Sequence, residues 1–284
     1  MRTAALPMTS TTRLESAAVG PAPPRAAGDF RHIVRLDKVD MTFGKVRALS
    51  QVDFEVGRNE IVGLVGDNGA GKSTLIKIVS GLLRPTSGSV AVRDEPIHLH
   101  DYSVRMAHAL RIETVHQGQT LGEKQPLWRN LFVGRQIVGR FGFIDVKKEK
   151  AIAEQILRQA IGFRGAGITA ESTVRDLSGG ERQGVAIARA MHFEADLIVL
   201  DEPTVALAVS EVRKVLAFVR KVKEAGRACI YIEHNLAHVH EVADRLVILD
   251  RGRVVGEFAK GAIGLAELTS HMISLHDGRA HGGD

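Results

Sequence analysis

A glycine-rich loop carries the clearest chemistry in this chain of 284 residues. The segment GDNGAGKS, Gly66 to Ser73, has the spacing G-x-x-x-x-G-K-S, which is typical of a loop that wraps the phosphates of a nucleoside triphosphate. Glycine lets the backbone curl so that successive amide groups face phosphate oxygens, and a helix starting there adds partial positive charge. We expect Lys72 to reach the β- and γ-phosphates and Ser73 to hold Mg²⁺.

The whole loop is expected to contact the nucleotide. The predicted contacts are Gly66, Asp67, Asn68, Gly69, Ala70, Gly71, Lys72, Ser73 and Thr74. Such a loop does not name a reaction by itself, because kinases, GTPases and motor ATPases share it.

Paired carboxylates follow another apolar run, LIVLDE, at residues 197–202. A buried strand that ends in Asp201 and Glu202 places both at the carboxyl edge, where open α/β sheets bind ligands. Asp201 is expected to reach Mg²⁺, directly or through water, and Glu202 to polarise an attacking water. The alternative is an acidic pair that merely closes a strand, and the phosphate loop in the same sheet disfavours it.

The segment LSGGERQ has two adjacent glycines where a helix is expected to begin. Each glycine costs roughly 1 kcal/mol there relative to alanine. Ser178 and Glu181 match a capping box, which explains the serine and the glutamate but not the glycines. We interpret the missing β-carbons of Gly179 and Gly180 as room for a large anionic ligand close to the backbone. The first loop is already expected to wrap one triphosphate, so this second helix start needs either a different ligand or the same ligand held by a different molecule.

The elements that position these residues alternate between strands and helices. A short apolar strand, EIVGLVG, ends at the phosphate loop, and an amphipathic helix follows. Further strand patterns lie in DLIVLDEPT and RACIYIEHN, and RLVILDRGRVVGEF predicts a hairpin that turns at Asp250 to Gly252. The apolar face of the first helix is predicted to consist of Leu75, Ile78, Val79 and Leu82.

The chain divides into regions of different composition and hydrophobic pattern. Residues 1–30 are rich in Ala, Pro, Ser and Thr, which predicts a disordered tail. Residues 31–257 carry the alternating strands and helices, with helical patterns dominating about 118–192, and residues 258–284 predict a helix followed by a polar tail. The expected fold class is therefore α/β, with a helical subdomain inserted in it.

Composition excludes several classes of protein. The longest apolar runs fall far short of the roughly 18 to 20 residues that a membrane-spanning helix needs, so any membrane role is expected to be peripheral. Cys229 is the single cysteine, which rules out an internal disulfide, and its apolar surroundings predict burial. The net charge of +5 is spread along the chain without a dense basic block.

Four segments in a fixed order, GDNGAGKST, LSGGERQ, LIVLDEPT and IEHN, resemble the ATP-binding subunit of an ABC transporter. The resemblance covers about residues 31–257, and LSGG is its most specific element. NLFVGR and DRGRVVGEF are similar to the bacterial subgroup that imports monosaccharides. The resemblance implies a P-loop ATPase core with a mixed sheet, an N-terminal antiparallel β region and the inserted helical subdomain.

The resemblance also implies roles for individual residues. Phe43 matches the aromatic residue that stacks on adenine, although an ordinary strand aromatic is the alternative. Gln117 matches the glutamine that senses Mg²⁺ and water, with Gln119 as the fallback. His234 matches the histidine that contacts the γ-phosphate. The implied cofactors are ATP and Mg²⁺.

The family resemblance further implies partners. Each ATP would lie between the phosphate loop of one subunit and Ser178 to Gly180 of a second copy or a homologous ATP-binding subunit. Transmembrane permease subunits would dock on the helical subdomain at the cytoplasmic face of the inner membrane, and a periplasmic substrate-binding protein would act indirectly. No nucleic acid is expected. The alternatives are a soluble ABC-type ATPase acting on ribosomes or DNA, and a P-loop kinase, which LSGG argues against.

Two positions depart from the family pattern. Ala208 stands where the family usually has an aspartate, so contacts which that carboxylate would make across a dimer are not expected here. Glu233 replaces the usual small residue before His234.

Overall fold

The computed structural model describes residues 30–115, 122–160 and 167–280. Of the tail expected over residues 1–30, only Phe30 is among the described residues. Gln117 and Gln119 also lie outside the described residues. Among the described residues, no helix has the length and apolar character needed to cross a membrane.

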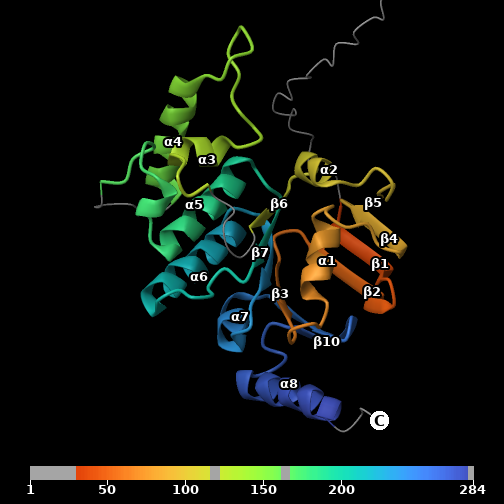
Figure 1. Ribbon diagram of the computed structural model, residues 1–284. Coiled ribbons are helices and arrows are strands. Elements are labelled where there is room, and N and C mark those ends of the chain that lie inside the picture. The colour runs from red at the N-terminus through yellow and green to blue at the C-terminus, as the bar shows by residue number, and fades with distance from the viewer. Residues whose placement is uncertain (1–29, 116–121, 161–166, 281–284) are drawn as a thin grey trace, which may run out of the picture.

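Two β-sheets form the centre of the fold (Figure 1). The smaller sheet is antiparallel in the order β2-β1-β4-β5 and holds the N-terminal strands. The six-stranded sheet has the order β10-β9-β3-β8-β7-β6, in which only β10 runs antiparallel to its neighbour. The expectation of a mixed sheet beside an N-terminal antiparallel region is confirmed. The strands are β1 (His32–Phe43), β2 (Val46–Gly57), β3 (Ile61–Val65), β4 (Ser87–Val92), β5 (Glu95–Pro96), β6 (Ile112–Val115), β7 (Leu197–Asp201), β8 (Ala228–Ile232), β9 (Arg245–Asp250) and β10 (Arg253–Ala259).

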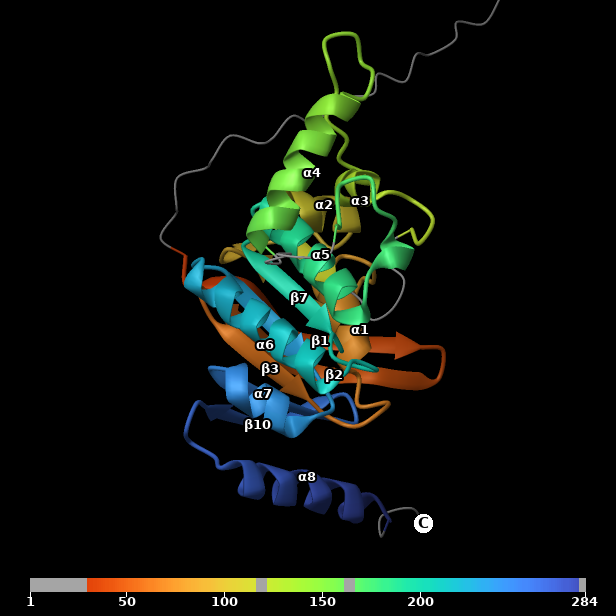
Figure 2. The same cartoon turned by 90° about the vertical axis from the view of Figure 1, so that its left-hand side faces the viewer.

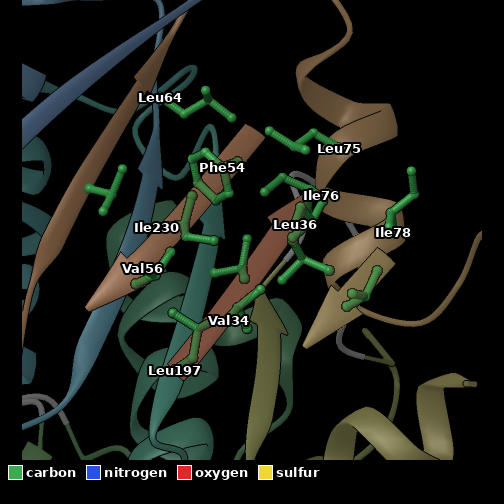
Figure 3. Packing of buried hydrophobic residues seen from close by; sticks show 14 of the residues in the cluster. Val34, Leu36, Phe54, Val56, Leu64, Leu75, Ile76, Ile78, Leu197 and Ile230 are labelled. Atoms are coloured by element: carbon green, nitrogen blue, oxygen red, sulfur yellow. The ribbon is translucent and has the colours of Figure 1, made fainter. Parts of the chain in front are cut away.

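Helix α1 (Lys72–Val79) and the antiparallel sheet pack on one face of the six-stranded sheet. Figure 3 shows this core, in which Phe54 of β2 and Leu75 of α1 lie close to Leu64 of β3. Alternating apolar residues on β1 and β2 supply most of the antiparallel side, because every second side chain of a strand points to the same face.

Helices α5 (Gly179–His192), α6 (Val209–Glu224) and α7 (Leu236–Val242) cover the opposite face, and α8 (Leu265–Ala280) lies beyond α7 at one end of the molecule (Figure 2). Cys229 is fully buried in this second core, as its surroundings predict. Parallel strands with both faces covered are apolar along their whole length, which explains the unbroken apolar runs of β3, β7 and β8.

A separate apolar cluster joins α3 (Leu127–Phe132), α4 (Val146–Ala160), the 3₁₀ turn Val174–Asp176 and one face of α5. Trp128 belongs to it and is 6% exposed, so its ring packs within this cluster. Helix α2 (Val104–Ala109) instead packs beside β6. Helix α5 contributes to both cores, so it connects this helical region to the sheet.

Local boundaries show one error in the sequence interpretation. Leu82 does not extend the apolar face of α1, because that helix ends at Val79 and the Leu82 side chain is 54% exposed. The hairpin between β9 and β10 turns where expected: Arg251 and Gly252 have φ of 46° and 73°, the left-handed conformations that two-residue hairpin turns require.

Candidate ATP-binding and hydrolysis site

The glycine-rich loop lies between β3 and α1, so its backbone amides end at a helix N-terminus. Gly66 and Gly71 have φ of 156° and 108°, and neither has room for a side chain. A β-carbon on Gly66 would lie 2.2 Å from the carbonyl oxygen of Leu249, and one on Gly71 would lie 2.7 Å from that of Ala48. The curled backbone is as predicted, and these contacts add a reason for the glycines that the sequence does not show.

Lys72 is buried inside this loop. Its Nζ donates hydrogen bonds to the carbonyl oxygens of Gly66, at 2.6 Å, and Asp67, at 3.1 Å. Burial lowers the pKa of Lys72, while the negative charges of Glu202, Asp67 and Asp201 oppose that shift. The structure therefore brings the loop lysine and both carboxylates of the LIVLDE segment into one electrostatic environment.

Asp201 and Glu202 lie at the carboxyl end of β7, at the sheet edge where they were predicted. Glu202 has a φ of 50°, and its amide donates a 3.0 Å hydrogen bond to the carbonyl oxygen of Ile232 at the end of β8. Its Oε1 accepts a 2.7 Å hydrogen bond from Nε2 of His234. The carboxylate predicted to polarise the attacking water and the histidine that the family resemblance implies are thus in direct contact.

Glu233 is a buried member of the same site, with only 3% of its surface exposed. Its Oε1 accepts hydrogen bonds from the Thr204 amide, at 2.9 Å, and from the Thr204 hydroxyl. Its Oε2 accepts a 3.1 Å hydrogen bond from the His234 amide. The sequence marks Glu233 as a departure from the family pattern but does not indicate that it links these two loops.

The LSGG segment forms the start of α5 with the predicted capping box. The Ser178 hydroxyl accepts a 3.3 Å hydrogen bond from the Glu181 amide, and the Glu181 carboxylate accepts one of 2.8 Å from the Ser178 amide. Ser178 and Gly179 are exposed, whereas Gly180 is buried.

The interpretation that Gly179 and Gly180 lack β-carbons only to admit an anionic ligand is wrong, because the chain itself crowds both positions. A β-carbon on Gly179 would lie 2.5 Å from Cδ2 of Leu207, and one on Gly180 would lie 2.8 Å from Cβ of Glu211. The first turn of α6 therefore leaves no room for a side chain at Gly180 even without a ligand, and the Leu207 side chain, from the loop before α6, occupies the space beside Gly179.

Glu211 is a residue of this region that sequence reasoning missed. Its carboxylate accepts hydrogen bonds from the amides of Gly180, at 3.3 Å, and Ala208, at 3.2 Å. Hydrogen bonds from the Ser178 hydroxyl and these two amides lower the pKa of Glu211. The available signal was its position in the first turn of α6, three residues after Ala208, where a carboxylate satisfies free helix amides.

Phe43 lies at the end of β1 and is 47% exposed, so its ring is accessible to a planar ligand. The residues present fit a nucleoside triphosphate, because a helix N-terminus, a loop of curled amides and a lysine converge on one place. The Ser73 hydroxyl and the Asp201 carboxylate are oxygen donors of the kind that Mg²⁺ prefers.

Parallel strands that deliver such a loop and an acidic pair to the same sheet edge define a P-loop nucleoside triphosphatase. Within that class, residues 49–205 match the ABC transporter family, which is more than half of the chain. The chain belongs to the ABC transporter family: it is an ATP-binding subunit, and it hydrolyses ATP in connection with transport.

Relatives with established names support the assignment. The chain is 38% identical over 252 residues to the xylose/arabinose import ATP-binding protein of Sulfolobus acidocaldarius, covering 89% of this chain and 98% of that protein. It is 39% identical over 216 residues to the fructose import ATP-binding protein of Rhizobium meliloti, covering 74% of this chain and 82% of that one. It is 37% identical to a ribose import ATP-binding protein of Streptomyces avermitilis, of which it spans only 42% while 79% of this chain is covered.

Solved structures confirm the fold. A nucleotide-free ATP-binding cassette from an ABC transporter superposes with a TM-score of 0.71 at 22% identity, covering 86% of this chain and 98% of that one. A dimeric cassette in a post-hydrolysis state with ADP and phosphate superposes with a TM-score of 0.66 at 24% identity, covering 81% of this chain and all of that one.

Proposed function

We propose that the chain hydrolyses ATP to drive the import of a simple sugar. The observation that carries the proposal is the match to the Sulfolobus xylose/arabinose protein, which this chain covers almost completely. The fructose and ribose import proteins support the same substrate class. The alternative of a soluble ATPase acting on ribosomes or DNA is not favoured, since these relatives are import proteins.

For hydrolysis, we propose that the loop from Gly66 to Thr74 binds the phosphates and Phe43 stacks on adenine. Ser73, Asp201 and Gln117 would hold Mg²⁺, which supplies positive charge to the phosphates. Glu202 polarises the attacking water, and His234 contacts the γ-phosphate. The 2.7 Å contact between the Glu202 and His234 side chains supports this division of roles, because both reach the same point beyond the strand ends.

For coupling, we propose that two copies, or one copy and a homologous subunit, close around ATP. The exposed Ser178 and Gly179 at the start of α5 would contact the ATP bound by the facing subunit. The dimeric cassette with ADP and phosphate supports this arrangement. The phosphates attract both positively poised surfaces, and hydrolysis followed by phosphate release removes that attraction.

We propose that residues 118–192 form a helical subdomain within an ATP-binding region of 31–257, with 258–284 as a C-terminal addition. The separate apolar cluster around α3, α4 and α5 supports a unit that can move as a body. Permease subunits would dock on this subdomain at the cytoplasmic face of the inner membrane. A periplasmic substrate-binding protein would deliver the sugar to the permease.

Sugar uptake by the native host tests the proposed import. We expect deletion of the gene to abolish uptake of one labelled monosaccharide from a panel that includes xylose, arabinose, ribose and fructose. The wild-type gene should restore uptake, whereas Lys72→Ala should not, because that variant lacks the charge that holds the phosphates. Unchanged uptake of every sugar in the deletion strain, together with RNA-stimulated ATP hydrolysis by the purified chain, would contradict the proposal.

A further inference from the structure

Glu233 is held by hydrogen-bond donors from two different loops. The amide and hydroxyl of Thr204 come from the loop after β7, and the amide of His234 comes from the loop after β8. All three donors are electrically neutral, and no lysine or arginine forms an ion pair with Glu233 within the described part of the chain. One carboxylate therefore joins the two loops that follow neighbouring parallel strands.

Burying a charged carboxylate such as that of Glu233 is energetically unfavourable. Removing an ionised carboxylate from water is strongly unfavourable, and this cost is offset only when hydrogen bonds satisfy both of its oxygens. The donors around Glu233 do this, but they do it only while Thr204 and the His234 amide keep their present positions. The Glu233 carboxylate therefore opposes separation of the two loops.

The two joined loops carry the residues proposed for hydrolysis. Glu202 precedes Thr204 by two residues, and His234 directly follows Glu233. A shift of either loop would lengthen the 2.7 Å contact between the Glu202 and His234 side chains. The left-handed conformation of Glu202 needs the same support, because a non-glycine residue in it has no intrinsic preference to stay there.

We propose that Glu233 is a positioning residue for ATP hydrolysis, which fixes Glu202 against His234 by holding Thr204 and the His234 amide on one carboxylate. The proposal rests on the roles proposed above for Glu202 and His234. A second set of contacts extends the same connection: Nδ1 of His238 in α7 lies 3.4 Å from the Thr204 hydroxyl oxygen, and Nε2 of His238 lies 3.3 Å from the Asn235 side chain.

Steady-state ATP hydrolysis by the full-length chain tests the proposal. We expect Glu233→Ala to lower kcat by on the order of tenfold to a hundredfold, because a small displacement of catalytic groups has effects of that size. KM for ATP should stay within about twofold, since the phosphate loop is not involved. The kcat of Glu233→Gln should lie between those of wild type and Glu233→Ala. The amide oxygen of the glutamine still accepts hydrogen bonds from Thr204, but its NH₂ group faces the His234 amide, which is also a donor.

A double mutant separates positioning from general loss of stability. If Thr204→Val and Glu233→Ala break the same connection, the kcat of the double variant should lie close to that of Glu233→Ala instead of showing the product of both effects. Glu149→Gln is the matched control for Glu233→Gln. It also removes a buried carboxylate, one that accepts a hydrogen bond from the Ile137 amide in the helical region, and its kcat should match wild type.

Two results would overturn the proposal. The first is a wild-type kcat for Glu233→Ala, and the second is a loss of kcat in Glu233→Ala that the fraction of unfolded protein explains in full. Parallel assays of Glu202→Gln and His234→Ala separate failure of this proposal from failure of the proposed roles of Glu202 and His234. If these two variants remain active, the proposed roles of Glu202 and His234 are wrong, whatever the behaviour of Glu233.

Discussion

At the scale of single residues, Glu202 combines an unfavourable backbone conformation with two specific contacts. Its φ of 50° costs about 1–3 kcal/mol for a residue other than glycine. The hydrogen bond from its amide to Ile232 and the contact of its carboxylate with His234 hold it there. Apolar periodicity predicts the strand that ends at Asp201, but it says nothing about the backbone of the next residue, so this geometry could not be predicted from the sequence.

The adjacent glycines of α5 give a prediction at the same scale. We expect Gly180→Ala to lower the free energy of unfolding by about 1–3 kcal/mol, because the new methyl group would lie 2.8 Å from Cβ of Glu211, close to the backbone of α6. Gly179→Ala should lower the free energy of unfolding much less, since the atom nearest to the new methyl group is the end of the flexible Leu207 side chain. Denaturant unfolding of both variants measures the difference. Equal stability of the two would contradict the steric explanation.

At the scale of elements, the sequence predicts the strands and helices well but not the contacts between distant ones. The apolar runs of β3, β7 and β8 and the hairpin of β9 and β10 follow from local patterns. Contacts such as those between Glu233 and Thr204, or Glu211 and Gly180, join residues about 30 positions apart and depend on which elements the fold places side by side. Residue types alone do not contain that information.

Glu113 of β6 joins three elements through charge. It is buried, its Oε1 lies 3.3 Å from Nδ1 of His108 in α2, and it forms an ion pair with Arg135, which follows α3. Burial alone would raise the pKa of Glu113, but the hydrogen bonds and positive charges of His108 and Arg135 outweigh it, and the net pKa is lowered. This cluster connects the six-stranded sheet to the helical region at the far edge of the sheet from β10.

The lowered pKa of Glu113 predicts a pH dependence of stability. A carboxyl group whose pKa is lower in the folded than in the unfolded chain stabilises the fold above its unfolded pKa, and loses that effect as pH falls through the folded pKa. We expect Glu113→Gln to lower the free energy of unfolding by about 3–5 kcal/mol at pH 7. The difference from wild type should shrink as the pH is lowered through the folded pKa. Urea unfolding at several pH values measures it, and a pH-independent difference would contradict this reasoning.

At the scale of the whole molecule, the features proposed for one ATP are divided between two surfaces. The phosphate loop, Lys72 and the acidic pair lie at the carboxyl edge of the six-stranded sheet. There the negative charges of Asp201 and Glu202 act on Lys72 and oppose the lowering of its pKa by burial. Ser178 and Gly179 are exposed at the start of another helix, where the nearby carboxylate is that of Glu211. A second copy of the chain would supply the missing surface to each site.

The most direct measurement of this central claim is the mass in solution of the full-length Glu202→Gln variant. That substitution should stop hydrolysis while leaving ATP binding intact, so a closed pair would accumulate. Light scattering after gel filtration should show a dimer in saturating Mg-ATP and a monomer in Mg-ADP, with Lys72→Ala in the same background as the control that stays monomeric. A Glu202→Gln chain that binds ATP and yet remains a monomer in saturating Mg-ATP would contradict the account.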